Sequence, residues 1–510
     1  MSVARNTLLL AIAKTFSVSL YFLFGIVLPW AVTEEANGVY TLMSTLIAIG
    51  GFVTMFGVPL LVTRGIARDP ARTAEAFVDA RTTTLLGSAA AALLVFGYLG
   101  LRMGLQDGWQ PPYLVLGLLI CGILYFDARG TVGEAVCQGH EAMQFPALIE
   151  ILTGTVKAGL AMAALFLLRG RVDDAVQLYA VYAMFLLGSV VRGMLLPAIA
   201  RRRFIPGELP APSLRRAGAL LSESVWLALF QVMRMLRNRM DILLLGLLVP
   251  VAAGMDEVAA GKAATGLYGQ AMRVVFVFHI FTDAFSRAIF PRMARLTRDP
   301  ATRDEARLQY LRTVAFQAWW AAPLAAVIFL YADQVAGWFG ATYRDGIPGL
   351  DGTTGDVLRI VALAMLLDSI GGPVGMVIIG IPGNERKLPW LGLALAGTSL
   401  LFNLLLIPRY GILGAAYACV AAAAAEFLVK ILIVRGLLSE PLAMLGRAAP
   451  CLVLAAALAA LLSATPLRAQ ALLGGAVLAV AYAGASAAFG LVDPAIKNRL
   501  RARFGRAPAA

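Results

Sequence analysis

Long, nearly uninterrupted apolar stretches dominate the chain, and short polar segments separate them. A helix that crosses the hydrocarbon layer of a membrane needs about 20 mostly apolar residues. Fourteen such spans are expected, at residues 7–30, 38–63, 82–101, 112–137, 145–168, 175–200, 218–248, 263–290, 313–331, 355–380, 388–407, 411–435, 446–466 and 470–492. The second span contains Gly57-Val58-Pro59, where we expect a kink. The pattern predicts an all-α polytopic membrane protein of about 14 transmembrane helices.

Composition agrees with this pattern and excludes other classes. The 510 residues are 60% apolar and 14% charged, whereas soluble domains are about 45–50% apolar and roughly 25% charged. The two histidines, His140 and His279, lie far apart and have no cluster of ligands around them. The four cysteines stand in apolar stretches without metal-ligand spacing: Cys121, Cys137, Cys419 and Cys451. We therefore expect no enzyme, no metal site and no cofactor, and the lack of a phosphate-binding G-x-x-x-x-G-K-[ST] run argues against ATP coupling.

The basic residues indicate an orientation in the membrane. The chain has 43 Lys and Arg residues and a net charge of +13. Of these, 25 fall in loops on the side of the N-terminus, counting Arg64 to Arg81 as one such loop, and only 7 fall in loops on the other side. By the positive-inside rule both termini are cytoplasmic. The charge is thus a topology signal and a contact for anionic lipid head groups, and we expect no nucleic-acid partner.

Two copies of a short pattern indicate an internal repeat. Gly38-Val39-Tyr40 precedes Arg68-Asp69-Pro70, and Gly266-Leu267-Tyr268 precedes Arg298-Asp299-Pro300 at nearly the same spacing. Because six spans separate the copies, the halves have the same orientation and form parallel repeats. The predicted domains are an N-lobe at 1–200, a proline-rich cytoplasmic linker at 201–217, a C-lobe at 218–435, two further helices at 436–492 and a basic cytoplasmic tail at 493–510.

The chain resembles the polysaccharide transporter family, the Wzx-type oligosaccharide flippases of the multidrug/oligosaccharidyl-lipid/polysaccharide exporter (MOP) superfamily. The resemblance is carried by Gly38-Val39-Tyr40 through Gly57-Val58-Pro59 to Arg64-Gly65-Ile66-Ala67, by Asp241-Ile242-Leu243-Leu244 before Gly266-Leu267-Tyr268 and Phe290-Pro291, by Trp338-Phe339-Gly340 with Tyr343, and by Asn403 with Pro408, Tyr410-Gly411 and Gly414-Ala415-Ala416. It covers nearly the whole chain. It implies two six-helix lobes in a V around a central cavity.

The resemblance also implies a function and its partners. Such proteins lie in the bacterial inner membrane and move polyprenyl-pyrophosphate-linked sugars from the cytoplasmic to the outer leaflet by alternating access, for exopolysaccharide, capsule or O-antigen synthesis. The expected partners are the lipid-linked glycan, membrane lipids, polysaccharide polymerase and export machinery, and Na⁺ or H⁺ as a coupling ion.

Ionisable residues inside a span are costly and usually face the bundle interior or water, which makes them functional candidates. On the span at 218–248 one stripe holds Glu223, Arg234, Arg237, Asn238 and Asp241, whereas Arg239 points nearly opposite. This stripe is either a cavity wall or an ion-pair lock between lobes.

Two other spans supply further candidates for the cationic cavity. Lys14 and Tyr21 share a stripe with Ser17 and Gly25 on the first span, where Lys14 is either a cavity residue or snorkels to the interface. Gln270 and Arg273 lie one turn apart on the span at 263–290. The substrate-binding candidates are Lys14, Tyr21, Arg234, Arg237, Asn238, Gln270 and Arg273.

Acidic residues in the spans are candidates for ion coupling or gating. Asp127, Thr131, Glu134 and Gln138 form one face of the span at 112–137, and Arg129 points away from it. These carboxylates either bind a coupling cation or neutralise an arginine of a neighbouring helix. Asp241 and Asp368 are further gating candidates. Three pairs are expected to be structural: Glu150 with Lys157, Asp283 with Arg287, and Glu426 with Lys430.

The balance of charge within the spans distinguishes between the possible functions. Basic residues outnumber acidic ones there by 11 to 8, which favours an anionic cargo such as a pyrophosphate. A multidrug extruder of the same superfamily, typically with twelve helices and a carboxylate-biased cavity, is the main alternative. A membrane glycosyltransferase or polymerase is less favoured, because the longest outer loop, 332–354, offers few catalytic side chains.

Overall fold

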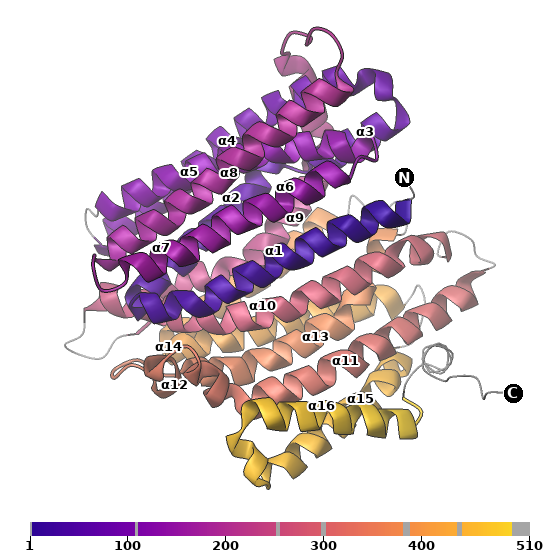
Figure 1. Cartoon of the computed structure of the whole chain (residues 1–510). Helices are drawn as coiled ribbons and strands as arrows, with labels where there is room; N and C mark the ends of the chain where they lie inside the picture. Colours follow the sequence, from indigo (N-terminus) through magenta and orange to yellow (C-terminus); the bar gives the residue numbers. More distant parts are fainter. Residues whose placement is uncertain are drawn as a thin grey trace, which may run out of the picture. The chain divides into compact units, whose positions relative to one another are not determined.

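The computed structural model describes residues 3–107, 111–250, 256–296, 302–380, 388–435 and 441–491 (Figure 1). Within these ranges the regular structure is helical, with no β-strand. The α-helices are α1 (Val3–Ala31), α2 (Glu34–Met55), α3 (Val58–Arg68), α4 (Thr73–Arg102), α5 (Pro111–Gly139), α6 (Gln144–Gly154), α7 (Leu160–Leu168), α8 (Asp174–Phe204), α9 (Leu214–Leu248), α10 (Glu257–Leu296), α11 (Arg303–Gly337), α12 (Ala341–Asp345), α13 (Thr354–Gly380), α14 (Leu388–Arg435), α15 (Pro441–Ser463) and α16 (Ala471–Ala488).

Every predicted span lies largely on helical residues, which confirms the all-α membrane fold, although α4 and α11 begin nine and ten residues before the predicted spans. Among the described residues, ten helical segments are long and apolar enough to cross a membrane. The number of fourteen spans stays a prediction. Hydropathy succeeds here because a spanning segment must satisfy its backbone polar groups internally, and a long apolar helix does so without help from its neighbours.

Two of the predicted spans are not simple helices, and a sharp break separates two others. The kink expected near Gly57 is a break, because Phe56 and Gly57 adopt left-handed backbone angles (φ 44° and 75°) between α2 and α3. The predicted spans at 388–407 and 411–435 both lie within α14, and the non-helical backbone of Gly411 (φ 55°, ψ −127°) separates them into two helical parts. The span at 145–168 consists of α6 and α7 joined by η3 (Thr155–Gly159), a π-helical turn.

The chain divides into two compact units. Unit 1 comprises Met1–Gly269 and Arg386–Leu400, and unit 2 comprises Gln270–Glu385 and Leu401–Ala510. Helix α9, the expected first helix of the C-lobe, therefore belongs to unit 1. The division into two repeated lobes stays a prediction, and the units are described separately below.

Unit 1 has a core of apolar side chains from α1, α2, α4, α5 and α8. Glycines allow α5 and α8 to approach closely. A Cβ atom on Gly193 would lie 2.5 Å from the carbonyl oxygen of Phe126, and one on Gly133 would lie 2.5 Å from the nitrogen of Pro197. Small residues at such crossings bring helix backbones into contact, which favours association inside a membrane.

The two copies of the repeated pattern meet in unit 1. A Cβ atom on Gly38 of α2 would lie 1.7 Å from the carbonyl oxygen of Lys262, and one on Gly266 of α10 would lie 2.3 Å from the carbonyl oxygen of Glu34. Each glycine thus contacts the residue four positions before the other, which makes the contact reciprocal. In addition, Asn37 Nδ2 donates to the carbonyl oxygen of Gly266 at 3.4 Å. Reciprocal contacts are what a two-fold axis between parallel repeats produces.

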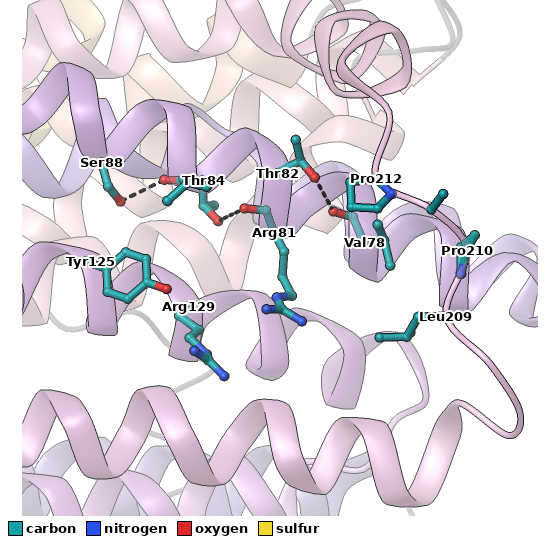
Figure 2. Close-up of a pocket in the computed structure, with 12 residues that line it drawn as sticks. Val78, Arg81, Thr82, Thr84, Ser88, Tyr125, Arg129, Leu209, Pro210 and Pro212 are labelled. Carbon is teal, nitrogen blue, oxygen red and sulfur yellow. Dashed lines mark hydrogen bonds between the residues drawn. The ribbon is translucent and has the colours of Figure 1, made fainter.

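The loop at 205–213, between α8 and α9, is held against α4. Arg216 Nε donates to both carboxylate oxygens of Asp79, at 3.0 and 3.1 Å, and Arg216 Nη2 donates to the carbonyl oxygen of Ala211 at 2.7 Å. Together with α4 and α5, this loop bounds a pocket of about 470 Å³ (Figure 2).

Unit 2 contains its own helix packing, in which α11 contacts α13, α15 and α16. Buried Ala322, Ala455 and Tyr482 form the centre of one cluster. Trp319 Nε1 donates to Ser486 Oγ at 2.9 Å, which ties α11 to α16. The last described helix is therefore part of the packed unit.

Substitution of Gly38 by alanine is expected to destabilise unit 1, because its Cβ atom would overlap the backbone of α10. Gly51 of the same helix has no atom within 4 Å of its Cβ position, so Gly51→Ala should be neutral or stabilising by up to about 1 kcal/mol through helix propensity. Thermal unfolding of the purified protein in detergent compares the two variants. Equal midpoints for Gly38→Ala and Gly51→Ala would contradict the close crossing.

His140, in the turn after α5, links three helix ends. Its Nε2 lies 3.0 Å from the hydroxyl of Thr73, and its ring stacks on Phe204 with the centroids 4.5 Å apart. The Thr73 hydroxyl donates to the carbonyl of Pro70, so it accepts from His140 Nε2–H. Burial lowers the pKa of His140 below its usual 6.5.

A lowered pKa makes this contact sensitive to acid. The folded state binds a proton at His140 less readily than the unfolded state does. The contribution of neutral His140 to the free energy of unfolding is therefore complete above pH of about 6.5, and it is lost as pH falls through the lowered pKa. We expect the unfolding temperature to fall between pH 7 and 5 by less in His140→Gln than in the unchanged protein. The same pH dependence in both proteins would contradict this.

Candidate functional site

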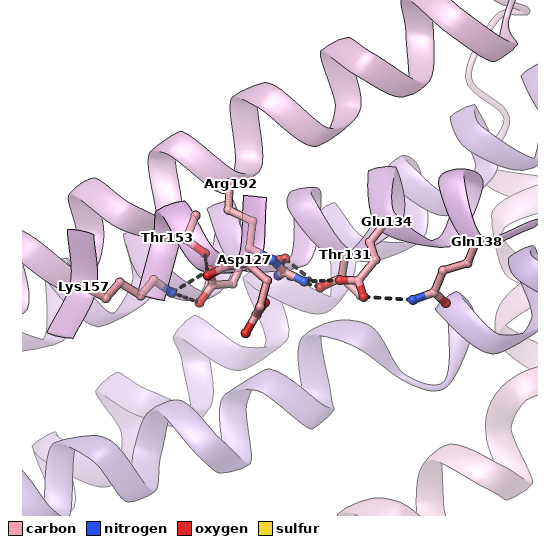
Figure 3. A network of polar contacts seen from close by, with 8 residues as sticks. Asp127, Thr131, Glu134, Gln138, Thr153, Lys157 and Arg192 are labelled. Carbon is pink, nitrogen blue, oxygen red and sulfur yellow. Dashed lines mark hydrogen bonds and ion pairs between the residues drawn. The ribbon is translucent and has the colours of Figure 1, made fainter. Parts of the chain in front are cut away.

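A polar network crosses the middle of unit 1 and begins with Asp127 of α5. Lys157 Nζ lies 2.9 and 2.8 Å from the two carboxylate oxygens of Asp127 (Figure 3). The side chains of Lys157 and Asp127 are only 12% and 22% exposed. Lys157 stands in the π-helical turn η3, and such turns change the direction of the residues that follow and are frequent at functional sites.

Arg192 of α8 completes the network. Its Nη2 lies 2.5 Å from Glu134 Oε2, and its Nη1 donates to the backbone oxygen of Asp127 and to the hydroxyl of Thr131, both at 2.9 Å. Gln138 Nε2 donates to the other oxygen of Glu134 at 2.9 Å. The acidic face of α5 predicted from the spacing is therefore formed, with every member engaged (Figure 3).

Glycines make room for both cations. A Cβ atom on Gly188 of α8 would lie 2.4 Å from Lys157 Cγ, and one on Gly130 of α5 would lie 2.8 Å from Arg192 Cγ. The aliphatic parts of Lys157 and Arg192 occupy the space that larger residues would fill. The position of each charge thus depends on a glycine of an adjacent helix.

Two carboxylates pair with the two cations of the network, and Glu150 adds a third negative charge that acts on Arg192. Asp127 and Glu134 are expected from the sequence either to bind a coupling cation or to neutralise a basic residue of a neighbouring helix. The observed geometry is that of the second alternative. The predicted partner of Lys157 is wrong: it pairs with Asp127 and not with Glu150, because the π turn changes the α-helical spacing between Glu150 and Lys157.

The other expected pairs have different outcomes. Lys430 and Glu426 lie 2.6 Å apart on α14, which confirms that pair. The side chains of Asp283 and Arg287 lie outside the described residues, as does the side chain of His279.

The stripe predicted on α9 runs from an exposed to a buried end. Asp241 is 4% exposed, and its carboxylate accepts hydrogen bonds from the Tyr268 hydroxyl and from the backbone N–H of Ile242. Glu223, Arg234 and Asn238 are exposed. The packing of α10 over Asp241 therefore closes one end of the stripe and leaves the other open.

The two arginines of this stripe have different surroundings, and Arg237 interacts electrostatically with Asp241. Arg237 Nη1 donates to the side-chain oxygen of Asn238 at 2.7 Å. Among the described residues, Arg234 has no ion-pair or hydrogen-bond partner for its guanidinium group. Arg239, predicted to point away from the stripe, still interacts electrostatically with Asp241.

Helix α1 divides its predicted polar stripe between two environments. The Ser17 hydroxyl is buried and donates to the backbone oxygen of Glu150 at 3.0 Å, which attaches α1 to α6. Lys14 and Tyr21 are exposed, and the Tyr21 ring lies 6.2 Å from that of Phe185. Ser17 is thus structural, and Lys14 and Tyr21 remain available to a ligand.

The candidates in unit 2 lie on α10 and α13. Arg273 Nη1 donates to Gln270 Oε1 at 2.7 Å, and Gln270 is 1% exposed. Asp368 is partly buried beside Ser369, whose hydroxyl lies 3.1 Å from that of Thr282. No group of three or more His, Cys, Asp or Glu side chains arranged to hold a metal occurs in the part of the chain that the structure describes.

The residue that the sequence interpretation missed is Arg192. It is an ionisable residue in the middle of a span, a position that marks functional or paired residues. That signal was present in the sequence, but the sequence gives no indication that Arg192 faces α5.

Residues 31–347 match the family described as polysaccharide biosynthesis protein. The chain belongs to this family. A search of curated proteins gave no match.

Several solved structures have the same fold. This member of the polysaccharide biosynthesis family is similar to the lipid II flippase MurJ in an inward closed conformation, with a TM-score of 0.69 at 14% identity over 93% of this chain and 98% of the other. It is similar to a MATE transporter in its bent conformation (TM-score 0.52, 17% identity, 86% and 96% covered). A MOP superfamily transporter from Pyrococcus furiosus gives a TM-score of 0.52 at 17% identity, with 86% and 97% covered. The chain therefore has the fold of these flippase and transporter structures.

The Asp127–Lys157 pair is expected to be strongly coupled. Asp127→Asn and Lys157→Gln should each destabilise the protein by leaving the other charge buried without its partner, and the double variant should recover about 1 kcal/mol or more. Unfolding in mixed detergent micelles measures this cycle.

The exposed pair Arg344–Asp345 provides the control, because its side chains are 56% and 57% exposed and water screens the charges. A cycle with Arg344→Gln and Asp345→Asn should show no measurable coupling. Additive effects of Asp127→Asn and Lys157→Gln would contradict the structural role of the network.

Proposed function

We propose that this protein is a flippase that moves a polyprenyl-pyrophosphate-linked oligosaccharide from the cytoplasmic to the outer leaflet of the bacterial inner membrane. It does so by alternating access, for the synthesis of exopolysaccharide, capsule or O-antigen. The polysaccharide biosynthesis family and the fold shared with a lipid II flippase support a transporter of a lipid-linked saccharide. Both termini are then cytoplasmic, and a polysaccharide polymerase and the export machinery act after the glycan has crossed.

The observation that carries the proposal is the distribution of charge in unit 1. The carboxylates Asp127 and Glu134 are matched by Lys157 and Arg192, whereas Arg234 on α9 is exposed without a carboxylate partner among the described residues. A cation in a low-dielectric layer is stabilised when an anion reaches it. A pyrophosphate supplies two negative charges and oxygen atoms that the fork of an arginine can bind.

The remaining candidates take roles that fit their surroundings. Lys14 and Arg237 in unit 1 and Arg273 in unit 2 add positive charge, and Tyr21 and Asn238 offer hydrogen bonds to sugar hydroxyls. Gln270 is buried and accepts from Arg273, so it positions that guanidinium group. Asp241, closed off by Tyr268, holds the buried end of the α9 stripe in place. Of the carboxylates proposed for ion coupling or gating, Asp127 and Glu134 pair with Lys157 and Arg192, and Asp368 stays a candidate in unit 2.

Reconstitution in liposomes tests this function. A fluorescent polyprenyl-pyrophosphate oligosaccharide should exchange between leaflets only when the protein is present. Arg234→Gln and Arg273→Gln should each slow the exchange about tenfold, the factor that one lost charge-assisted hydrogen bond produces. Arg72→Gln removes an exposed charge from η1 (Pro70–Arg72) and should leave the rate unchanged.

Transport of a different cargo would overturn the proposal. If the lipid-linked glycan does not exchange, and the same vesicles accumulate organic cations against a Na⁺ or H⁺ gradient, the protein is a multidrug extruder. Folding of each variant is checked by its unfolding temperature before the rates are compared.

A further inference from the structure

Unit 1 has a pocket beside the loop at 205–213 that is lined by none of the candidate site residues. It is lined by α4 (Val78, Arg81, Thr82, Thr84, Leu85, Ser88), by α5 (Tyr125, Arg129) and by the loop (Leu209, Pro210, Ala211, Pro212). All of these residues belong to unit 1. Its volume of about 470 Å³ lies within the range of ligand pockets.

Two arginines enter this pocket from different helices. Figure 2 shows the guanidinium groups of Arg81 and Arg129 pointing into the same open space. The sequence predicts Arg81 in a loop, and it predicts that Arg129 points away from the acidic face of α5. The structure places Arg81 inside α4, and it places Arg129 on the face of α5 that lies beside α4 at this point.

Neither arginine is neutralised within the protein. Among the described residues, Arg129 Nε is buried without a hydrogen-bond partner, and the Arg81 guanidinium contacts only the ring of Phe77, 5.6 Å from its centroid. None of the twelve lining residues is acidic. Asp79 of α4 binds Arg216, and Glu134 of α5 binds Arg192. Two like charges that converge in this way are stabilised by an anion between them.

Of the hydroxyl groups that line the pocket, only that of Tyr125 can donate a hydrogen bond to an anion. The hydroxyls of Thr82, Thr84 and Ser88 donate to backbone carbonyls of α4, so these hydroxyl groups do not donate hydrogen bonds to a ligand. The Tyr125 hydroxyl makes no hydrogen bond to any described residue and lies beside Arg129 (Figure 2). The donors available to a ligand are therefore two guanidinium groups and one phenol.

Apolar surface adjoins the charged site. Leu85, one turn after Arg81, is 56% exposed, and Leu118, on the same face of α5 as Arg129, is 65% exposed. Exposed leucines on a membrane helix face acyl chains. Arg81 lies about 12 Å along α4 from its start, at 1.5 Å per residue, a depth from which an arginine reaches the phosphate level of a leaflet. The strongly basic segment Arg201 to Arg203 precedes the loop.

We propose that this pocket binds the phosphodiester head group of an anionic phospholipid of the cytoplasmic leaflet, such as phosphatidylglycerol. Arg81 and Arg129 hold the phosphate from α4 and α5, the Tyr125 hydroxyl donates to it, and the acyl chains lie along the leucines of the two helices. Basic pockets between membrane helices on the cytoplasmic side are suited to such head groups. The bound lipid fastens the loop at 205–213 to α4 and α5.

Native mass spectrometry of the full-length protein in detergent tests this site with defined lipids. The protein should retain phosphatidylglycerol at concentrations at which phosphatidylcholine is lost. The double variant Arg81→Gln/Arg129→Gln should bind phosphatidylglycerol about tenfold more weakly, as expected for the loss of charge-assisted hydrogen bonds. The control Arg64→Gln/Arg72→Gln removes the same number of exposed charges outside the pocket and should bind as the unchanged protein does.

Three outcomes would overturn the proposal. They are equal retention of phosphatidylglycerol and phosphatidylcholine by the unchanged protein, equal weakening in the pocket and control variants, and displacement of the lipid by an equal concentration of inorganic phosphate, which would indicate a site for a free anion. If the glutamine variant does not fold, Arg81→Lys/Arg129→Lys keeps both charges and should still prefer phosphatidylglycerol. No transport is measured, so the result is independent of the proposed flippase activity.

Discussion

The cost of placing charge in a low-dielectric layer is the constraint on which the structure of unit 1 depends. Asp127, Glu134, Lys157 and Arg192 come from three consecutive segments of the membrane domain and neutralise one another within hydrogen-bonding distance. Leaving any one of them unpaired would cost several kcal/mol. Their pairing therefore fixes how α5, the α6–α7 segment and α8 are placed relative to one another.

Glycines make this neutralisation possible. Gly188 and Gly130 leave space for the aliphatic parts of Lys157 and Arg192, and Gly133 and Gly193 bring the backbones of α5 and α8 together. The reciprocal contact of Gly38 with Gly266 applies the same principle where the two copies of the repeat meet. Charge and close packing are thus coupled, because a larger side chain at one of these glycines would displace a cation or separate two helices.

The helices could be predicted from the sequence, whereas the partners of the charges could not. Hydropathy is a local property, and every predicted span is helical. The pairing of Lys157 with Asp127 depends on the π turn at Thr155–Gly159, and no local sequence pattern predicts that turn. The convergence of Arg81 and Arg129 depends on the rotation of α4 against α5, and the contact of Asp241 with Tyr268 depends on the packing of α10 on α9. These are tertiary arrangements, and a spacing within one helix does not determine them.

The proposed function follows from the lack of a described carboxylate partner for Arg234 on α9. Carboxylates balance the cations around α5, and the exposed Arg234 on α9 is left for a ligand that brings its own negative charge. Binding of two lipids that differ only in charge tests this claim most directly: a polyprenyl-pyrophosphate oligosaccharide and the same oligosaccharide on an uncharged polyprenol. The account predicts that the pyrophosphate-linked form binds the purified protein at least about tenfold more tightly. Equal affinities for the two lipids would contradict it.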